Sequence, residues 1–259
     1  MNRTEMQDRT SPKPPIAPEV VRVLRRTSTA TIATLLYKRG FRNCYIQGVG
    51  RLGPVKPRMV GEAFTLRYIA AREDTDLLEV FRDPGHPQRV AVEICPEGHV
   101  LVMDCRGDAS AASAGAILLT RLAVRGVAGV VTDGGIRDAD EAVKLELPVF
   151  TAKPSAPTNL TKHHAVDLNV PISCGQVPVY PGDVMVGDGD GVMVIPRHLA
   201  AEIAEEASGM EDYEAFVMHQ VASGASIVGL YPATDPANLE KFAEWMKTRA
   251  PKAEEVPAK

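Results

Sequence analysis

Residues 127–138 read Val-Ala-Gly-Val-Val-Thr-Asp-Gly-Gly-Ile-Arg-Asp, and this stretch decides both the fold class and the candidate site. The apolar run Val127 to Thr132 predicts a buried strand, and Asp133-Gly134-Gly135 predicts a turn out of it. Arg137 and Asp138 then emerge at the carboxyl end of the strand. Ligands of open α/β sheets bind at that edge, so these two side chains are the first candidates for chemistry.

The segments on either side of this stretch predict a parallel sheet. Val100–Asp104 is almost fully apolar, which is typical of a central strand covered on both faces. Ser110–Arg125 has helical spacing of its apolar residues, Asp138–Leu145 predicts a short helix, and Pro148-Val149-Phe150 begins a third strand. The order strand–helix–strand–helix–strand implies parallel pairing with right-handed crossovers.

The flanking regions complete an α/β pattern. Helices are expected from about Glu19 to Arg25 and from Ala30 to Arg39, with Ser28 as N-cap and Gly40 as the stop of the second. Beyond residue 154, short strands alternate with turns, Asp188-Gly189-Asp190-Gly191 is a hairpin signal, and Pro196–Ser208 is a helix. The sequence therefore predicts a layered α/β domain with mixed sheets and helices packed on one side.

The domain boundaries follow from composition. Residues 1–18 are polar and proline-rich and are expected to be a mobile N-terminal tail. Residues 19–235 contain no internal repeat or linker and predict a single domain. Residues 236–259 are expected to form a C-terminal helix and tail.

Composition excludes several classes of protein. Hydrophobic residues make up 45% and charged residues 24% of the 259 residues, as in soluble globular proteins. The net charge of −4 argues against direct nucleic-acid binding, and no apolar run approaches the roughly 20 residues that cross a bilayer. The N-terminus lacks a secretory signal, and the four cysteines lack zinc-type spacing. Reduced, buried thiols in a cytoplasmic protein are expected.

Arg137 and Asp138 have two interpretations. Arg137 can clasp a carboxylate through two parallel hydrogen bonds, and Asp138 is a hard oxygen ligand suited to a magnesium-like ion. Alternatively, Arg137 caps the end of the strand and Asp138 caps the next helix. Residue pattern alone does not favour one interpretation over the other.

A second candidate is the small-residue segment Ser113–Leu118, near the start of the helix that follows the other buried strand. Free backbone N–H groups at a helix N-terminus bind anions. The alternative is that the small residues let this helix pack tightly on the sheet. The adjacent His163-His164 is expected to be a surface loop, because neighbouring side chains on a strand point to opposite sides and rarely chelate one metal together.

Taken together, the motifs resemble the RraA-like family, which includes the 4-hydroxy-4-methyl-2-oxoglutarate aldolases and the regulators of ribonuclease E. The resembling stretches are Ser28–Thr31, Val60–Thr65, Gly98–Asp104, Gly126–Asp138 and Tyr180–Val184 running into Asp188–Val192. The resemblance covers roughly residues 27 to 200. It implies a β/β/α layered, swivelling-type domain with mixed sheets that assembles into a homo-oligomer, a trimer or a hexamer, with sites between subunits.

The resemblance also implies an activity. It is that of a divalent-metal-dependent lyase, of the aldolase or oxaloacetate decarboxylase type, which acts on pyruvate-derived 2-oxo acids through a metal-bound enolate. Mg²⁺ or Mn²⁺ would be held by Asp138, and Arg137 would hold the substrate oxygens. The backbone N–H groups of the segment Gly115, Ala116, Ile117 and Leu118 would bind the pyruvyl carboxylate.

One residue departs from the family pattern, in which an acidic residue is followed by twenty residues and then Arg-Asp. The position of that acid is Ala116 in this chain. Alanine supports neither the water shell of a metal nor proton transfer, so Asp108 or an acid from another subunit would have to replace it. Two alternatives therefore stay open: a sugar-acid lyase or hydratase with the same enolate site, and a non-catalytic regulator that binds a ribonuclease.

Overall fold

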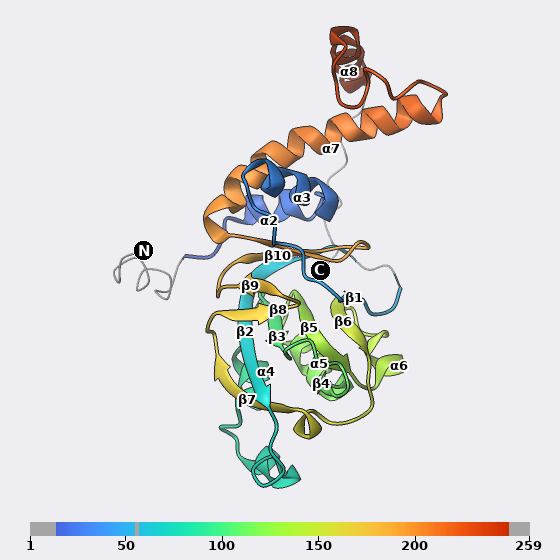
Figure 1. The fold of residues 1–259 in the computed structure, drawn as a ribbon. Coiled ribbons are helices and arrows are strands. Elements are labelled where there is room, and N and C mark those ends of the chain that lie inside the picture. The colour runs from blue at the N-terminus through green and yellow to red at the C-terminus, as the bar shows by residue number, and fades with distance from the viewer. Residues whose placement is uncertain (1–13, 55–56, 249–259) are drawn as a thin grey trace. The chain divides into compact units, whose positions relative to one another are not determined.

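The protein is described by a computed structural model over residues 14–54 and 57–248 (Figure 1). The chain divides into two compact units, Met1–Ala207 and Ser208–Lys259. Of the two terminal segments predicted from the sequence, residues 1–13 of the first and residues 249–259 of the second lie outside the described residues. Within the described ranges, no helix combines the length and the apolar character needed to span a bilayer.

A nine-stranded mixed sheet forms the body of the first unit, in the order β1-β6-β5-β3-β2-β10-β11, with β4 paired to β5 and β7 paired to β2. Its strands are β1 (Gly50–Arg51), β2 (Met59–Ala70), β3 (Val100–Asp104), β4 (Ala112–Ala114), β5 (Gly129–Ile136), β6 (Val149–Pro154), β7 (His163–Leu168), β10 (Val184–Gly187) and β11 (Val192–Ile195). A separate two-stranded sheet joins β8 (Ile172–Cys174) to β9 (Val177–Val179). The predicted α/β fold with mixed sheets is confirmed.

The centre of the sheet is parallel, as predicted. β2, β3, β5 and β6 run in the same direction along the order of the sheet. The long strand β2 pairs with antiparallel β10 through Met59–Glu62 and with β3 through Ala63–Arg67, so it is shared by the two halves of the sheet. The predicted hairpin at residues 188–191 joins antiparallel β10 and β11.

The predicted turn at Gly134-Gly135 is wrong, because β5 continues through both glycines to Ile136. A Cβ atom at Gly134 would lie 2.6 Å from the Cys105 sulfur, and one at Gly135 would lie 2.5 Å from the Ser155 Cβ. The glycines therefore allow neighbouring segments to approach the strand closely rather than turning it.

The helix predicted for Ser110–Arg125 begins later than expected. Its first residues form β4, and α5 runs from Ala116 to Val124. Ser113 explains the change, because its hydroxyl donates to the Gly135 carbonyl at 3.0 Å and lies in hydrogen-bond contact with the Thr132 hydroxyl, also at 3.0 Å. These bonds hold the segment in an extended conformation against β5. The next predicted helix, Asp138–Leu145, shortens to α6 (Ala139–Ala142).

Two further elements complete the surroundings of the candidate site. They are the 3-10 helix η1 (Leu78–Arg82), which falls where a short helix over Thr75–Phe81 is compatible with the sequence, and the helix α4 (Pro87–Ile94), which the sequence analysis did not anticipate. α4 begins with a proline, which is well suited to the first turn of a helix, and packs beside α5 and β7. A second, short 3-10 helix, η2 (Asn159–Thr161), precedes β7.

The N-terminal helices α2 (Pro18–Leu24) and α3 (Thr29–Lys38) match the predicted helices closely. Ser28 caps α3 as predicted, and its hydroxyl accepts a hydrogen bond from the Thr31 N–H at 3.0 Å. Gly40 follows the helix with a φ of +88°, a conformation that favours glycine at a helix stop. Asp188, from the β10–β11 hairpin, accepts from the N–H and the hydroxyl of Thr29 and so ties α3 to the sheet.

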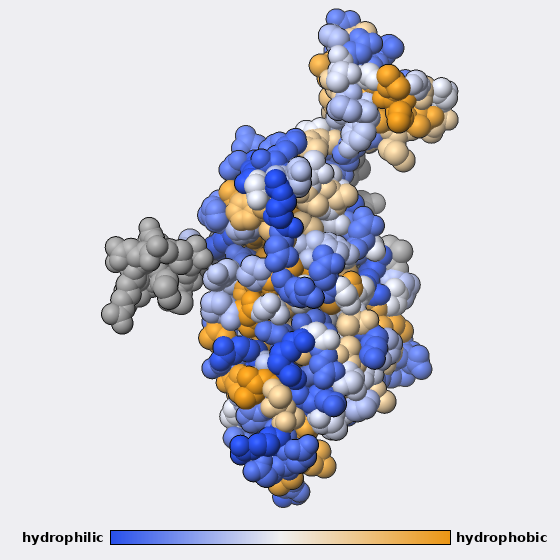
Figure 2. All heavy atoms as spheres, in the orientation of Figure 1, coloured by the Kyte–Doolittle hydropathy of each residue, from blue (hydrophilic) through white to orange (hydrophobic). Residues whose placement is uncertain are grey.

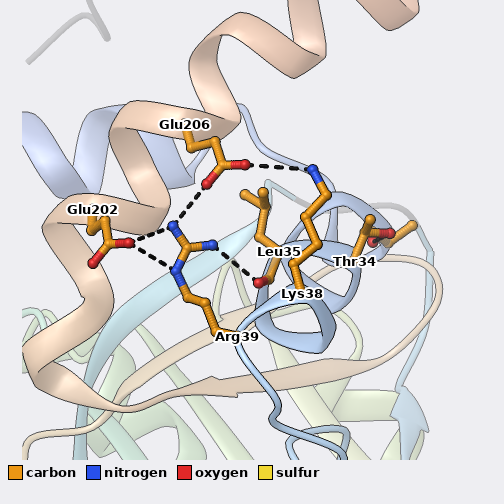
Figure 3. A network of polar contacts seen from close by, with 7 residues as sticks. Thr34, Leu35, Lys38, Arg39, Glu202 and Glu206 are labelled. Carbon is orange, nitrogen blue, oxygen red and sulfur yellow. Dashed lines mark hydrogen bonds and ion pairs between the residues drawn. The ribbon is translucent and has the colours of Figure 1, made fainter. Parts of the chain in front are cut away.

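An ionic network fixes the base of α7 (Ala200–Ala222), which follows the 3-10 helix η3 (Arg197–Leu199), to α3 (Figure 3). The guanidinium group of Arg39 donates to Glu202 at 2.6 Å and to Glu206 at 2.7 Å, and Lys38 reaches Glu206 at 3.5 Å. The Arg39 side chain is only 18% exposed, so solvent screens its ion pairs less than it screens pairs between fully exposed side chains.

The second unit contains the end of α7 and the helix α8 (Pro236–Thr248). Phe216, Val217 and Leu230 are buried in it and pack against Tyr213, Phe242 and Trp245. The sequence analysis extended one domain to residue 235, whereas the contacts of the chain divide at Ala207 and Ser208. This small aromatic cluster, formed within the unit itself, accounts for the earlier division. Apolar atoms also lie on the surface of this unit (Figure 2), where Met218 and Val228 are largely exposed.

The cysteines are free and buried, as predicted for Cys44, Cys95, Cys105 and Cys174. Burial raises the pKa of each thiol, to about 12 for Cys95. A thiol with a raised pKa is a weak nucleophile at neutral pH. The four side chains therefore act as small apolar groups.

The expected surface loop at His163-His164 is wrong, because both residues lie in β7, and His163 is completely buried. Its ring packs against Tyr68 at a centroid distance of 5.6 Å, and its Nδ1 lies 3.3 Å from the Arg106 guanidinium. Nε2 has no hydrogen-bond partner among the described residues. Burial, followed by the charge of Arg106, lowers the pKa of His163. Pairing of β7 with β2 covers a residue that the sequence alone placed in a loop.

We expect His163 to make the folded protein less stable in acid. Because its pKa is lower in the folded state, the unfolded chain binds a proton first as the pH falls below about 6.5, and stability then decreases with falling pH. One such group changes the free energy of unfolding by at most about 1.4 kcal/mol per pH unit. Urea unfolding between pH 7.5 and 5 should therefore show a shallower loss of stability in His163→Phe than in the wild type.

The matched control is His198→Phe, at an exposed position. If the free energy of unfolding falls equally steeply with pH in the wild type and in His163→Phe, His163 does not contribute to the loss of stability in acid. Some slope should persist in the variant, because burial also lowers the pKa of His86.

Candidate active site

A cavity of about 90 Å³ lies where α4, α5 and the residues after β5 meet. Of the predicted site residues, Gly115, Ile117, Leu118, Arg137 and Asp138 line it. Ala116 is not among the lining side chains, but its backbone N–H donates to Asp138. The structure therefore brings both predicted segments, which are about twenty residues apart in sequence, to one place.

Pairing between β4 and β5 brings the two segments together. Ala112 lies opposite Gly135 and Ala114 opposite Ile136, and the Arg137 N–H donates to the Ala114 carbonyl at 3.1 Å. The next residue after β4 is Gly115, the N-cap of α5. As a result, the N-terminus of α5 and the pair Arg137-Asp138 face the same space.

Asp138 has an unusual backbone conformation, with φ 55° and ψ 44° in the left-handed region. It occupies the N-cap position of α6 but makes no capping hydrogen bond with its side chain. Its Oδ2 instead accepts from the Ala116 N–H at 3.2 Å and lies 3.6 Å from Arg137 Nε. Within the described residues Oδ1 has no hydrogen-bond partner. Asp138 therefore stands at the N-cap position that the alternative interpretation gives it, but its side chain makes no cap bond, and its carboxylate lines the cavity.

Gly115 makes this close approach possible. A Cβ atom at this position would lie 2.7 Å from Asp138 Oδ2 and 2.8 Å from Arg137 Nε. Real Cβ atoms do not approach so closely, so any other residue would push the Arg137-Asp138 pair away. The N-terminus of α5 also lacks a side-chain cap, which leaves the first-turn N–H groups of Ile117 and Leu118 as free donors for an anion.

The cavity offers few protein ligands for a divalent metal ion. No group of three His, Cys, Asp or Glu side chains converges within residues 14–54 and 57–248, so the described chain offers no cage of protein ligands. Asp138 presents one unpartnered carboxylate oxygen at a half-exposed position. Magnesium is commonly held by one or two carboxylates, with substrate oxygens and water completing the octahedron. Asp138 fits that mode of binding.

The buried side chain of Gln88 holds the backbone segment that leads into the site. The Gln88 side chain, from α4, donates to the Ser113 carbonyl at 2.6 Å, and the Tyr68 hydroxyl reaches the same oxygen at 3.3 Å. These contacts hold β4 and thereby the start of α5. Sequence reasoning missed Gln88 because α4 is short; the only local signal was Pro87 at the start of the helix.

Other lining residues were also missed. Phe81, Arg89, Thr158 and Asn159 come from η1, α4 and the segment at the start of η2. Asp108, which was considered as a substitute for the missing acid, does not line this cavity. Its carboxylate instead accepts from the N–H and hydroxyl of Ser110, which lower its pKa.

Comparison with known proteins identifies the family. The sequence model of the RraA-like family, described as Aldolase/RraA, matches residues 29–194. The chain belongs to this family. The match ends before the second unit begins at Ser208.

Curated relatives within the RraA-like family share only part of their length with this chain. A protein of Halalkalibacterium halodurans, named "Putative 4-hydroxy-4-methyl-2-oxoglutarate aldolase", is 41% identical over 110 residues, which are 42% of this chain and 52% of that protein. A protein of the same name from Ectopseudomonas mendocina is 38% identical over 109 residues, 42% of this chain and 67% of that one. The matches thus span about half to two thirds of these relatives.

Solved structures of RraA-like proteins cover more of the chain. Streptomyces coelicolor RraAS2, described as an unusual member of the RNase ES inhibitor RraA protein family, has a TM-score of 0.70 and 31% identity over 79% of this chain and 98% of its own. An uncharacterized protein from Pseudomonas syringae pv. tomato has a TM-score of 0.71 and 25% identity over 85% of this chain and all of its own. Both bear out the predicted fold.

We expect Gly115→Ala to disable the cavity without unfolding the protein. The new methyl group must displace Arg137 and Asp138, so binding of oxalate or pyruvate should weaken at least about tenfold, the loss expected for about 1.4 kcal/mol of contacts. Calorimetric titration would measure it. Gly50→Ala is the control, because a Cβ there meets no atom within 4 Å. Equal affinity in Gly115→Ala and wild type would contradict this geometry.

Proposed function

We propose that this RraA-like protein is a divalent-metal-dependent lyase that cleaves or decarboxylates pyruvate-derived 2-oxo acids. The observation that carries the proposal is the convergence of Arg137, Asp138 and the uncapped N-terminus of α5 on one small cavity. The names of the relatives in Halalkalibacterium and Ectopseudomonas support an aldolase-type reaction.

Each group of the cavity has a role in this proposal. The N–H groups of Ile117 and Leu118 bind the pyruvyl carboxylate, aided by the partial positive charge of the helix N-terminus. Arg137 donates to the substrate's 2-oxo oxygen and stabilises the negative charge that develops there as a carbon–carbon bond breaks. Asp138 holds Mg²⁺ or Mn²⁺, which when bound supplies a Lewis acid to the same end of the substrate.

Proton transfer needs a group from elsewhere. Within the described part of the chain, Asp138 supplies the only carboxylate that lines the cavity, and it is committed to the metal in this proposal. Ala116 occupies the first turn of α5, where the family pattern has an acid. We therefore assign the proton step to solvent water or to an acidic residue of a second subunit, rather than to Asp108.

A regulatory function is the second candidate. RraAS2, which matches over most of its length, belongs to a family described as inhibitors of RNase ES, and the loss of the acid at Ala116 weakens the case for catalysis. The retained Arg137-Asp138 pair favours chemistry. The same pair would also serve a sugar-acid lyase or hydratase, in which only the leaving group differs.

We also propose that the protein is a homo-oligomer, a trimer or a hexamer, whose subunits meet near this cavity. Ile117 and Val124, on one face of α5, are 79% and 74% exposed, and Leu78 of η1 is 71% exposed. Ile117 also lines the cavity, and exposed large apolar side chains of this kind are typical of an interface. Light scattering at micromolar protein should give a multiple of the chain mass; a monomer mass would contradict the proposal.

The activity is tested by pyruvate release from 4-hydroxy-2-oxo acids and from oxaloacetate, with and without Mg²⁺ or Mn²⁺. Asp138→Asn should lower the affinity for Mg²⁺ at least about tenfold, because the amide oxygen carries no formal charge, and kcat/KM by about 10²-fold. Calorimetry and a coupled pyruvate assay measure the two effects separately.

Asp140→Asn is the matched control, since Asp140 lies in the adjacent α6 and does not line the cavity. Equal Mg²⁺ affinity in Asp138→Asn and wild type would remove Asp138 as the metal ligand. No pyruvate release by the wild type from either substrate class, with metal bound, would favour the regulatory function.

A further inference from the structure

A second guanidinium group lines the cavity that holds Arg137. It belongs to Arg89, in the first turns of α4, which is half-buried. In the described part of the chain, the Arg89 side chain has no carboxylate within ion-pair distance and no hydrogen bond to another residue. Arg121, on neighbouring α5, provides the contrast, because it makes a two-pronged pair with Glu93 and does not line the cavity.

Arg89 is nevertheless held in place by an aromatic platform. Its guanidinium carbon lies 4.5 Å from the centroid of the Phe81 ring, a cation–π contact. The other neighbour of Phe81 is His86, whose ring meets it edge-on at a centroid distance of 5.2 Å. Stacking on Phe81 restricts the guanidinium without neutralising its charge. Both Phe81 and Arg89 line the cavity, so the charge is presented to whatever enters it.

Among the described residues, no group that lines the cavity forms an ion pair with Arg89. Burial, followed by the charge of Arg89, lowers the pKa of His86. The His86 ring is therefore neutral at neutral pH and supplies no positive charge for an anion. Gln88 is already bonded to the Ser113 carbonyl. Thr158 and Asn159 are uncharged, and Asp138 is next to Arg137. The lining therefore carries two guanidinium groups and one carboxylate.

We propose that Arg89 determines substrate specificity by binding a second carboxylate, at the end of the 2-oxo acid remote from the reacting carbonyl. This inference rests on the proposed function for the assignment of the pyruvyl end to α5 and Arg137. A guanidinium fork matches a carboxylate through two parallel hydrogen bonds, and its placement on Phe81 reduces the conformational freedom lost on binding. Arg89 is thus expected to favour a 2-oxo acid whose far end carries a carboxylate over one whose far end is apolar.

The test compares two ligands of equal chain length, 2-oxoglutarate and 2-oxopentanoate, which differ in a distal carboxylate against a methyl group. Calorimetric titration of the full chain, with and without Mg²⁺, should show at least about tenfold preference for 2-oxoglutarate, the size expected of a charge-assisted hydrogen bond. Arg89→Met should lose that preference, weakening 2-oxoglutarate about tenfold or more and changing 2-oxopentanoate less than about threefold. Phe81→Leu should give a smaller loss in the same direction.

Arg121→Met is the control for removing an arginine from the same helical layer, and it should keep the preference. A wild type that binds the two ligands equally, or an Arg89→Met variant that weakens both equally, would overturn the inference. Thermal unfolding monitored by circular dichroism distinguishes a misfolded variant; in that event Arg89→Gln, which keeps polarity without charge, must show the selective loss. If the wild type prefers 2-oxoglutarate but releases pyruvate from no substrate, the assignment of Arg89 as a carboxylate-binding residue is retained and the lyase proposal fails.

Discussion

The pairing of the short strand β4 with the end of β5 is the interaction on which the candidate site depends. It consists of few hydrogen bonds, among them the Gly135 N–H to the Ala111 carbonyl and the Arg137 N–H to the Ala114 carbonyl, both at 3.1 Å. Ser113 reinforces it from within the sheet. Without this ladder, the N-terminus of α5 and the Arg137-Asp138 pair would be independent segments. The cavity is therefore a product of sheet pairing rather than of a flexible loop.

Absence of a side chain is the second constraint at this edge of the sheet. Gly134 and Gly135 let Cys105 and Ser155 lie against β5, and Gly115 leaves room for the two charged side chains. The left-handed backbone of Asp138 completes the arrangement. A strained polar residue persists only where its surroundings fix it. Here the fixed element is the carboxylate that accepts from the first N–H of α5, which couples the position of Asp138 to the helix itself.

Local sequence patterns predicted those elements whose stability is local. The strand at Val100–Asp104 matched without change, and the Ser28 cap was correct because both depend on neighbouring residues. The end of β5 and the burial of His163 were mispredicted, because partners distant in sequence decide them. Arg137 and Asp138 could be found from their motif. Arg89 could not, since nothing in its own helix distinguishes it from an arginine exposed to solvent.

The charges of the cavity bear on the acid that this chain lacks. An aspartate at position 116 would stand in the first turn of α5, beside the carboxylate of Asp138 that accepts from the Ala116 N–H. Two adjacent carboxylates would balance the guanidinium groups of Arg137 and Arg89. With alanine the lining keeps an excess of one positive charge, before any metal binds. An excess positive charge in a small, partly enclosed site favours a ligand with more than one negative charge. The substitution that removes a proton-transfer group therefore also makes the cavity better suited to a dianion.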